Sequence, residues 1–229
     1  MIAGKYICVF TDETQSSLGK GVARFIVNSL YTELPDFASN WLFILAGTFV
    51  LESKILKATP ADRAFLKLVV EKLNDQEVKQ ILQGTVKGTS VVFPNDVCKD
   101  IAKDSQGIPY YVQLFGDKFF ILRKKGVVTK SFYSQNRKRV IHDIGKTLFD
   151  SRLKDLKRRG LYFDILVSFA KLDKEEGVSV REAAKGIDTD NPGFYVQELE
   201  SKGYLIRVKR GRYRLVDNLF REWICKHYK

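Results

Sequence analysis

Two adjacent carboxylates, Asp12 and Glu13, directly follow the short apolar run Ile7–Thr11. An acidic pair at the end of a strand can divide the work of phosphoryl transfer. Asp12 would hold a Mg²⁺-bound water, and Glu13 would polarise the attacking water as general base. Adjacent acids at a strand end also occur as helix caps or as plain surface charge. The pair alone is therefore a weak signal, and its meaning depends on the elements around it.

The segments on either side of this pair predict a parallel sheet. Ile7–Thr11 is continuously apolar, Val22–Tyr31 has helical spacing, and Trp41–Ala46 is a second apolar run that ends at Gly47-Thr48. A strand, a helix and a strand at this spacing predict two parallel strands, buried on both faces, in an α/β sheet. Cys8 would then be a small core residue. Thr48, at the end of the second strand, is the candidate sensor of a γ-phosphate.

A phosphate-binding loop is missing from the sequence. Gly4-Lys5 and Gly19-Lys20-Gly21 both contain Gly-Lys, but neither has a Gly five residues earlier or a Ser/Thr after the Lys. Without such a loop the chain lacks a preorganised cradle for anions. We therefore expect negligible ATP turnover by this chain unless another polypeptide supplies that half.

Helical patterns dominate the middle of the chain. We predict helices at Asp75–Leu82, with Asn74 as the N-cap, at Pro94–Asp104 and at Tyr110–Leu122. The basic segment Gly126–Arg139 is weakly patterned. We interpret it as a connector and place a domain boundary at its end.

From Ile141 onward the pattern changes to that of a winged helix-turn-helix. We predict a helix that continues to Leu156, and then the elements of the motif proper. These are a helix at Leu161–Leu172, a short helix at Val180–Lys185, a third helix at Phe194–Lys202, a hairpin at Tyr204–Val216, and a last helix lined by Leu219, Trp223 and Ile224.

The chain is strongly basic, with a formal net charge of +12, which suits a polyanionic partner. One basic cluster, Lys118–Arg139, is equally well explained as a solvated surface. The other, Lys202–Arg214, falls on the predicted hairpin, where a wing would meet DNA phosphates. Glu198 and Glu200 on the third helix count against tight base reading, so a partner-docking role is the alternative. The candidate DNA contacts are Arg207, Lys209, Arg210 and Arg212 from the hairpin, and Tyr195, Gln197 and Lys202 from the third helix.

Taken together, these stretches resemble the archaeal STAND-type P-loop ATPases, which are related to AAA+ proteins. The similarity includes Asp12, Glu13 and Gln15 after the first strand and Gly47-Thr48 after the second. It continues with Gly107-Ile108-Pro109-Tyr110-Tyr111, a looser match at Asp62-Arg63-Ala64-Phe65, and a closing segment with Tyr213, Leu215, Asp217, Phe220 and Trp223.

The resemblance implies an α/β fold with three parts. These are a partial P-loop NTPase parallel sheet in residues 1–56, a helical lid and connector in 57–139, and a winged-helix domain in 140–229. It implies ATP and Mg²⁺ as cofactors, with Asp12 as the metal ligand, Glu13 as the base, Thr48 as the phosphate sensor and Arg63 supporting charge.

Two alternatives remain open besides this ATPase interpretation. One is a DNA-binding or partner-docking winged helix on a degenerate ATPase remnant. The other is a metal-dependent nuclease that uses Asp12 and Glu13, which would lack the extra carboxylate and Lys that such sites gather. Three cysteines far apart in the sequence predict no disulfide framework, and no apolar run is long enough to span a membrane. We therefore expect a cytoplasmic protein.

Overall fold

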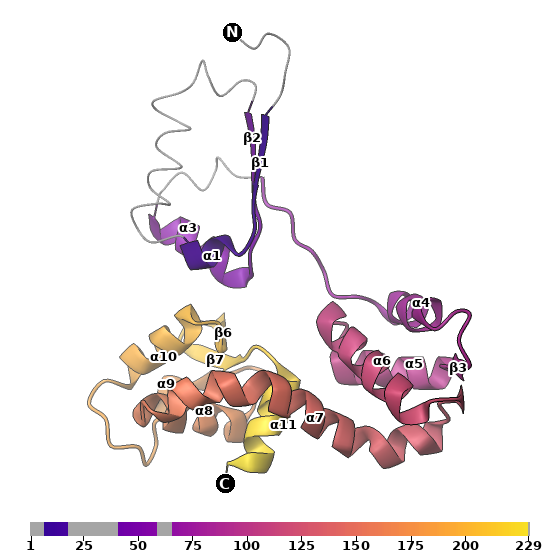
Figure 1. Ribbon diagram of the computed structural model, residues 1–229. Coiled ribbons are helices and arrows are strands. Elements are labelled where there is room, and N and C mark those ends of the chain that lie inside the picture. Colours follow the sequence, from indigo (N-terminus) through magenta and orange to yellow (C-terminus); the bar gives the residue numbers. More distant parts are fainter. Residues whose placement is uncertain (1–6, 18–40, 59–65, 229) are drawn as a thin grey trace. The chain divides into compact units, whose positions relative to one another are not determined.

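The computed structural model describes residues 7–17, 41–58 and 66–228 (Figure 1). One compact unit is formed by the chain up to Val69, and another by most of the chain from Val70 on. Within the described ranges no helix combines the length and the hydropathy needed to cross a bilayer.

The first unit contains a pair of parallel strands. β1 (Ile7–Thr11) pairs along its whole length with β2 (Trp41–Leu45), as the sequence predicts. The short helix α1 (Thr14–Ser17) follows β1, and α3 (Phe49–Ala58) follows β2. The predicted helix at Val22–Tyr31 lies outside the described residues.

One face of this strand pair is apolar and exposed. The register places Cys8 beside Leu42 and Phe10 beside Ile44, and side chains alternate between faces along a strand. Phe10 is 61% exposed, Leu42 is 57% exposed, and Cys8 is exposed as well. The prediction that both faces are buried, with Cys8 in the core, is therefore wrong. The reason is that no described element covers this face.

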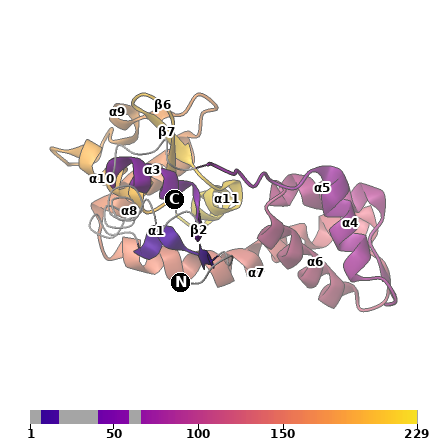
Figure 2. The same ribbon diagram turned by 90° about the horizontal axis from the view of Figure 1, so that it is seen from above.

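The second unit begins with three helices that pack on one another (Figure 2). They are α4 (Asp75–Thr85), α5 (Asn95–Ser105) and α6 (Pro109–Arg123), as predicted. Asn74 caps α4 in a reciprocal capping box with Glu77, which satisfies donors that the first turn leaves open. The sequence did not predict the parallel pairing of two short strands, β3 (Val91–Val92) and β4 (Gly126–Val127).

A single long helix, α7 (Lys130–Lys157), replaces most of the predicted connector. Its basic first half has little hydrophobic periodicity, but Tyr133 and Val140 on its inner side are buried. The interpretation of this segment as a connector is therefore wrong, and the predicted boundary at residue 139 falls inside the helix. Tertiary burial of a few side chains decides its conformation.

The remaining elements form a small antiparallel sheet with helices around it. In chain order they are α8 (Leu161–Leu172), β5 (Val178–Ser179), α9 (Val180–Ala183), α10 (Pro192–Ser201), β6 (Leu205–Lys209), β7 (Arg212–Leu215) and α11 (Asn218–His227). The strand order in the sheet is β5-β7-β6, in which β6 and β7 are the predicted hairpin. Ser179, the N-cap of α9, forms a second capping box, with Glu182.

Polar contacts join α7 and the start of α11 to the helices α5 and α6. Asp104 of α5 accepts hydrogen bonds from Arg137 Nε at 2.5 Å, from Arg137 Nη2 at 2.8 Å and from the Tyr133 hydroxyl. The Tyr111 hydroxyl of α6 donates to Asp217, whose other oxygen caps α11 at Phe220 N. Burial raises the pKa of both tyrosines, so both remain neutral donors at neutral pH.

Candidate active site and basic hairpin

Three of the predicted catalytic residues, Asp12, Glu13 and Thr48, lie just beyond the carboxyl ends of β1 and β2. The two ends are joined by backbone hydrogen bonds from Ala46 N to Thr11 O at 2.8 Å and from Thr14 N to Ala46 O at 3.0 Å. Asp12 and Glu13 therefore emerge beside Gly47 and Thr48. Strand pairing alone places these residues at one edge of the sheet.

Gln15 connects the acidic pair to the second strand end. Its side-chain Nε2 donates to Glu13 Oε2 at 2.6 Å, and its Oε1 accepts from Thr48 N at 3.2 Å. The amide is buried, and Lys54 Nζ donates to the Gln15 carbonyl at 2.6 Å. Gln15 thus fixes the position of the Glu13 carboxylate relative to Thr48. In the sequence Gln15 stands out only as part of the motif after the first strand, and its spacing alone did not predict this role.

Gly47 leaves room for the side-chain amide of Gln15. A Cβ at position 47 would lie 2.3 Å from Gln15 Oε1, well inside van der Waals contact. In this arrangement the Gln15 amide would have to shift to accommodate any larger residue. The Gly-Thr pair therefore has a steric explanation that the sequence did not reveal.

Glu13 has a left-handed backbone, with φ at +52°. For a residue with a side chain this conformation costs roughly 1–2 kcal/mol, and strain of this kind is concentrated at functional sites. Glu13 N also donates to Asp12 Oδ1 at 2.7 Å. Both carboxylates are exposed at the edge, where they can reach a ligand in solvent.

The donor set fits a Mg²⁺ ion that is held mainly by water and by a nucleotide. Asp12 offers one carboxylate oxygen that is not used by Glu13 N. In the described part of the chain, no three acidic, His or Cys side chains converge as an all-protein metal site would need. Arg63, the predicted charge-supporting residue, lies outside the described residues.

The predicted DNA contacts separate into two environments. Arg207, Lys209 and Arg210 are exposed on the hairpin, where a register shift between Arg207 and Lys209 marks a bulge. Arg212 instead turns back into the fold. Its Nη1 donates to the Gly177 carbonyl at 2.9 Å and lies 3.8 Å from a carboxylate oxygen of both Glu176 and Glu182.

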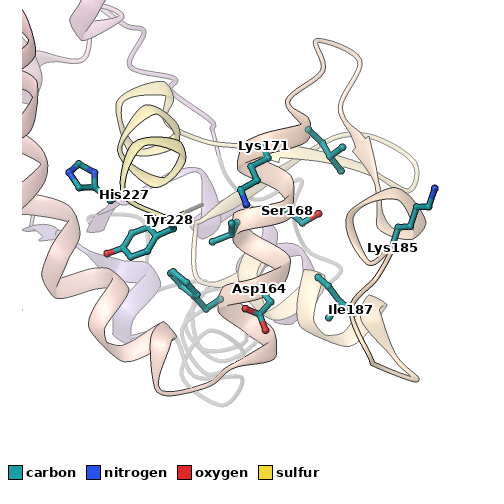
Figure 3. Close-up of a pocket in the computed structure, with 10 residues that line it drawn as sticks. Asp164, Ser168, Lys171, Lys185, Ile187, His227 and Tyr228 are labelled. Carbon is teal, nitrogen blue, oxygen red and sulfur yellow. The ribbon is translucent and has the colours of Figure 1, made fainter.

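Gln197 on α10 is exposed, and so is Lys202 in the turn just after this helix, whereas Tyr195 packs edge-on against the Tyr162 ring with centroids 4.8 Å apart. Tyr195 also lines an open hollow in front of the helix. A different hollow, of about 640 Å³, lies against α8 and the end of α11 and contains none of the predicted site residues. Figure 3 shows this hollow: Lys171 lies on the side of Tyr228, whereas Lys185 points away from both residues. The two charged groups of the hollow's lysines therefore do not converge.

The chain is similar in fold to several proteins of known structure. The Walker-type ATPase PABY2304 of Pyrococcus abyssi matches with a TM-score of 0.65 and 18% identity, over 96% of this chain and 63% of that protein. The RuvB Holliday junction branch migration motor of Thermotoga maritima matches with a TM-score of 0.50 and 17% identity, over 94% of this chain and 68% of that one.

No protein-family model and no curated protein matches the chain. The likenesses above cover nearly all of this chain, which spans 63% of the length of the Pyrococcus protein. Sequence identity this low supports a statement about fold and not about activity. The chain therefore has a mixed α/β fold that is similar to the folds of the Walker-type ATPase and of RuvB.

Proposed function

We propose that the edge formed by Asp12, Glu13, Gln15 and Thr48 is the hydrolytic half of an ATP site of the archaeal STAND type. Asp12 would hold a Mg²⁺-bound water, Glu13 would polarise the attacking water, and Thr48 would sense the γ-phosphate. The observation that carries the proposal is the hydrogen-bonded link Glu13–Gln15–Thr48, which holds the general base against the second strand end.

The other half of the site, the loop that grips the phosphates, would come from another polypeptide segment. Residues 1–229 contain no Gly-x-x-x-x-Gly-Lys-Ser/Thr sequence. Parallel sheets normally have both faces covered, whereas β1 and β2 expose Phe10 and Leu42 on one face. This uncovered face is consistent with further elements that pack on the pair.

ATP hydrolysis by the chain alone tests the proposal. We expect only background turnover from the unmodified chain and from Glu13→Gln, because the phosphate grip is absent. The matched control is Glu175→Gln, an exposed acid in the second unit. Turnover that is lost in Glu13→Gln and kept in the control would show that the chain hydrolyses ATP by itself. That result would contradict the need for a second segment.

Addition of a separate P-loop-bearing segment provides the positive test. A polypeptide containing the strand and Gly-x-x-x-x-Gly-Lys-Ser/Thr loop of a related ATPase would be titrated into the chain. We expect turnover to appear and to require Glu13 and Gln15. If turnover appears equally with Glu13→Gln, this edge is not the hydrolytic site.

A second candidate function, contact with DNA, is favoured by the hairpin. The element order α8, β5, α9, α10, β6, β7 is that of a winged helix-turn-helix, with the hairpin as the wing. The exposed cations Arg207, Lys209 and Arg210 at its tip and edge suit backbone phosphates. The engagement of Arg212 with Gly177 and nearby acids favours a structural role for that residue.

Salt-dependent binding of a duplex tests this second function. Lys209→Ala with Arg210→Ala should weaken binding equally for all sequences and lower the salt slope by about 2. Lys124→Ala with Lys125→Ala removes two exposed cations elsewhere and serves as the control. Equal effects of the two double variants would argue against the hairpin as the contact surface.

A further inference from the structure

An aromatic hollow opens at the start of α10. It has a volume of about 370 Å³ and is lined by Leu161, Phe194, Tyr195 and the turn residues 188–191. Phe194 is 50% exposed, although full burial of a phenylalanine side chain is worth about 1.5–3 kcal/mol. The hollow therefore presents an apolar surface that a ligand can still bury.

Contacts within the chain position the aromatic wall of this hollow. Phe194 packs edge-on against Tyr195 with centroids 5.6 Å apart, and Tyr195 packs edge-on against Tyr162. Asn191 holds the turn, since its side-chain oxygen accepts from Phe194 N at 3.2 Å. A preformed wall loses little conformational entropy on binding.

The two charged residues that line the hollow, Asp188 and Asp190, are both acidic, whereas the chain as a whole carries +12. Both aspartates are exposed. Cations follow at a further distance along the chain, with Lys185 before this turn and Arg158 and Arg159 before Leu161. Arg159 lies over the Tyr162 ring, at 5.9 Å from its centroid.

This local charge decides between two classes of partner. Nucleic acid phosphates would be repelled by the two aspartates, whereas lysines and arginines of a peptide would be attracted to them. An apolar anchor in a pocket with charged groups around it is also the usual form of a binding hot spot.

We propose that this hollow docks a basic peptide segment of a partner protein. An aliphatic or aromatic side chain of the segment would enter between Phe194 and Leu161. Flanking lysines or arginines would lie against Asp188 and Asp190. This docking site is independent of the ATP site and of the hairpin, because it shares no residue with the exposed cations of the wing or with the strand ends.

Fluorescence anisotropy with labelled peptides and the full chain tests the proposal. The first probe is Lys-Arg-Lys-Leu-Phe-Lys-Arg-Lys, the second replaces Leu-Phe by Ser-Ser, and the third replaces every basic residue by Glu. We expect saturable binding of the first probe, at least tenfold weaker binding of the second, and no binding of the third that depends on Phe194. Because the chain is itself positive, nonspecific electrostatic forces repel the first probe and attract the third.

Substitutions in the lining of the hollow test whether the first probe binds there. Asp188→Asn with Asp190→Asn and, separately, Phe194→Ala should each weaken binding of the first probe at least tenfold. The matched control, Asp150→Asn with Glu175→Gln, removes two exposed acids elsewhere and should change binding less than twofold. The aspartate variant changes only exposed side chains, so it remains informative if Phe194→Ala fails to fold. Urea unfolding checks each variant.

Three outcomes would overturn the proposal. They are failure of the first probe to bind, equal weakening by the control variant, and binding of labelled duplex DNA that requires Phe194 while peptide binding does not. Loss of the wing cations should leave peptide binding unchanged. A negative result for DNA binding or for ATP hydrolysis would therefore leave the peptide-docking proposal unaffected.

Discussion

The two compact units differ in how their polar contacts lie relative to buried side chains. Among the described residues of the first unit, Gln15 links an exposed acidic residue to Thr48, and the buried residues are few: Thr14, Gln15, Val50 and Leu51. In the second unit polar contacts such as Arg137–Asp104 lie beside a large apolar core. We therefore expect substitutions in the core of the second unit to change the stability of the chain more than substitutions at the strand ends of the first.

The largest expected effect on stability comes from a substitution at Gly145, in the core of the second unit. A Cβ there would lie 2.1 Å from the buried Trp223 ring. Gly145→Ala should lower the free energy of unfolding by about 3 kcal/mol, as overpacking does. Urea unfolding monitored by tryptophan fluorescence measures the loss.

Gly84→Ala is the matched control, because position 84 lies in α4 with open space around its Cβ. There the helix-forming alanine should raise stability by about 0.5–1 kcal/mol. If Gly145→Ala left the free energy of unfolding unchanged or raised it, the tight packing of α7 on α11 would be refuted.

A somewhat smaller effect is expected from the polar network of the second unit. Asp104→Asn removes the charge that accepts from Arg137 and Tyr133, and should cost about 2–3 kcal/mol. Asp100→Asn on the same helix breaks only a 3.7 Å ion pair with Lys130, and should cost less than about 1 kcal/mol. Urea midpoints compare the two.

A substitution in the first unit completes the comparison with the Asp104 and Asp100 variants. Gln15→Leu should leave the main unfolding transition near its original midpoint, because Gln15 organises an edge and not the large core. A loss comparable to that of Asp104→Asn would mean that the two units do not differ in the way described above.

The smallest effect is chemical and concerns the cysteines. Cys8 in the first unit and Cys225 in α11 are exposed, whereas Cys98 in α5 is buried, and its burial raises the pKa of the thiol to about 11. At pH 8 a thiol-specific reagent should label two cysteines quickly and Cys98 only in denaturant, as intact-mass spectrometry would show. Rapid labelling of Cys98 in the folded chain would contradict its burial.

Local interactions explain why much of the fold could be predicted from the sequence. The capping residues Asn74 and Ser179 begin helices where the sequence places them, and Gly211 sits between the two strands of the predicted hairpin. The parallel pairing of β1 and β2 followed from strand-helix-strand spacing. It places Asp12, Glu13 and Thr48 at one edge.

Tertiary structure alone decided the rest, since it depends on which surfaces meet. The exposure of Phe10, the helical conformation of Lys130–Arg139 and the inward turn of Arg212 all follow from distant partners or from their absence among the described residues. Short-range chemistry sets where helices and strands begin, whereas burial and close approach between distant segments set what each side chain does.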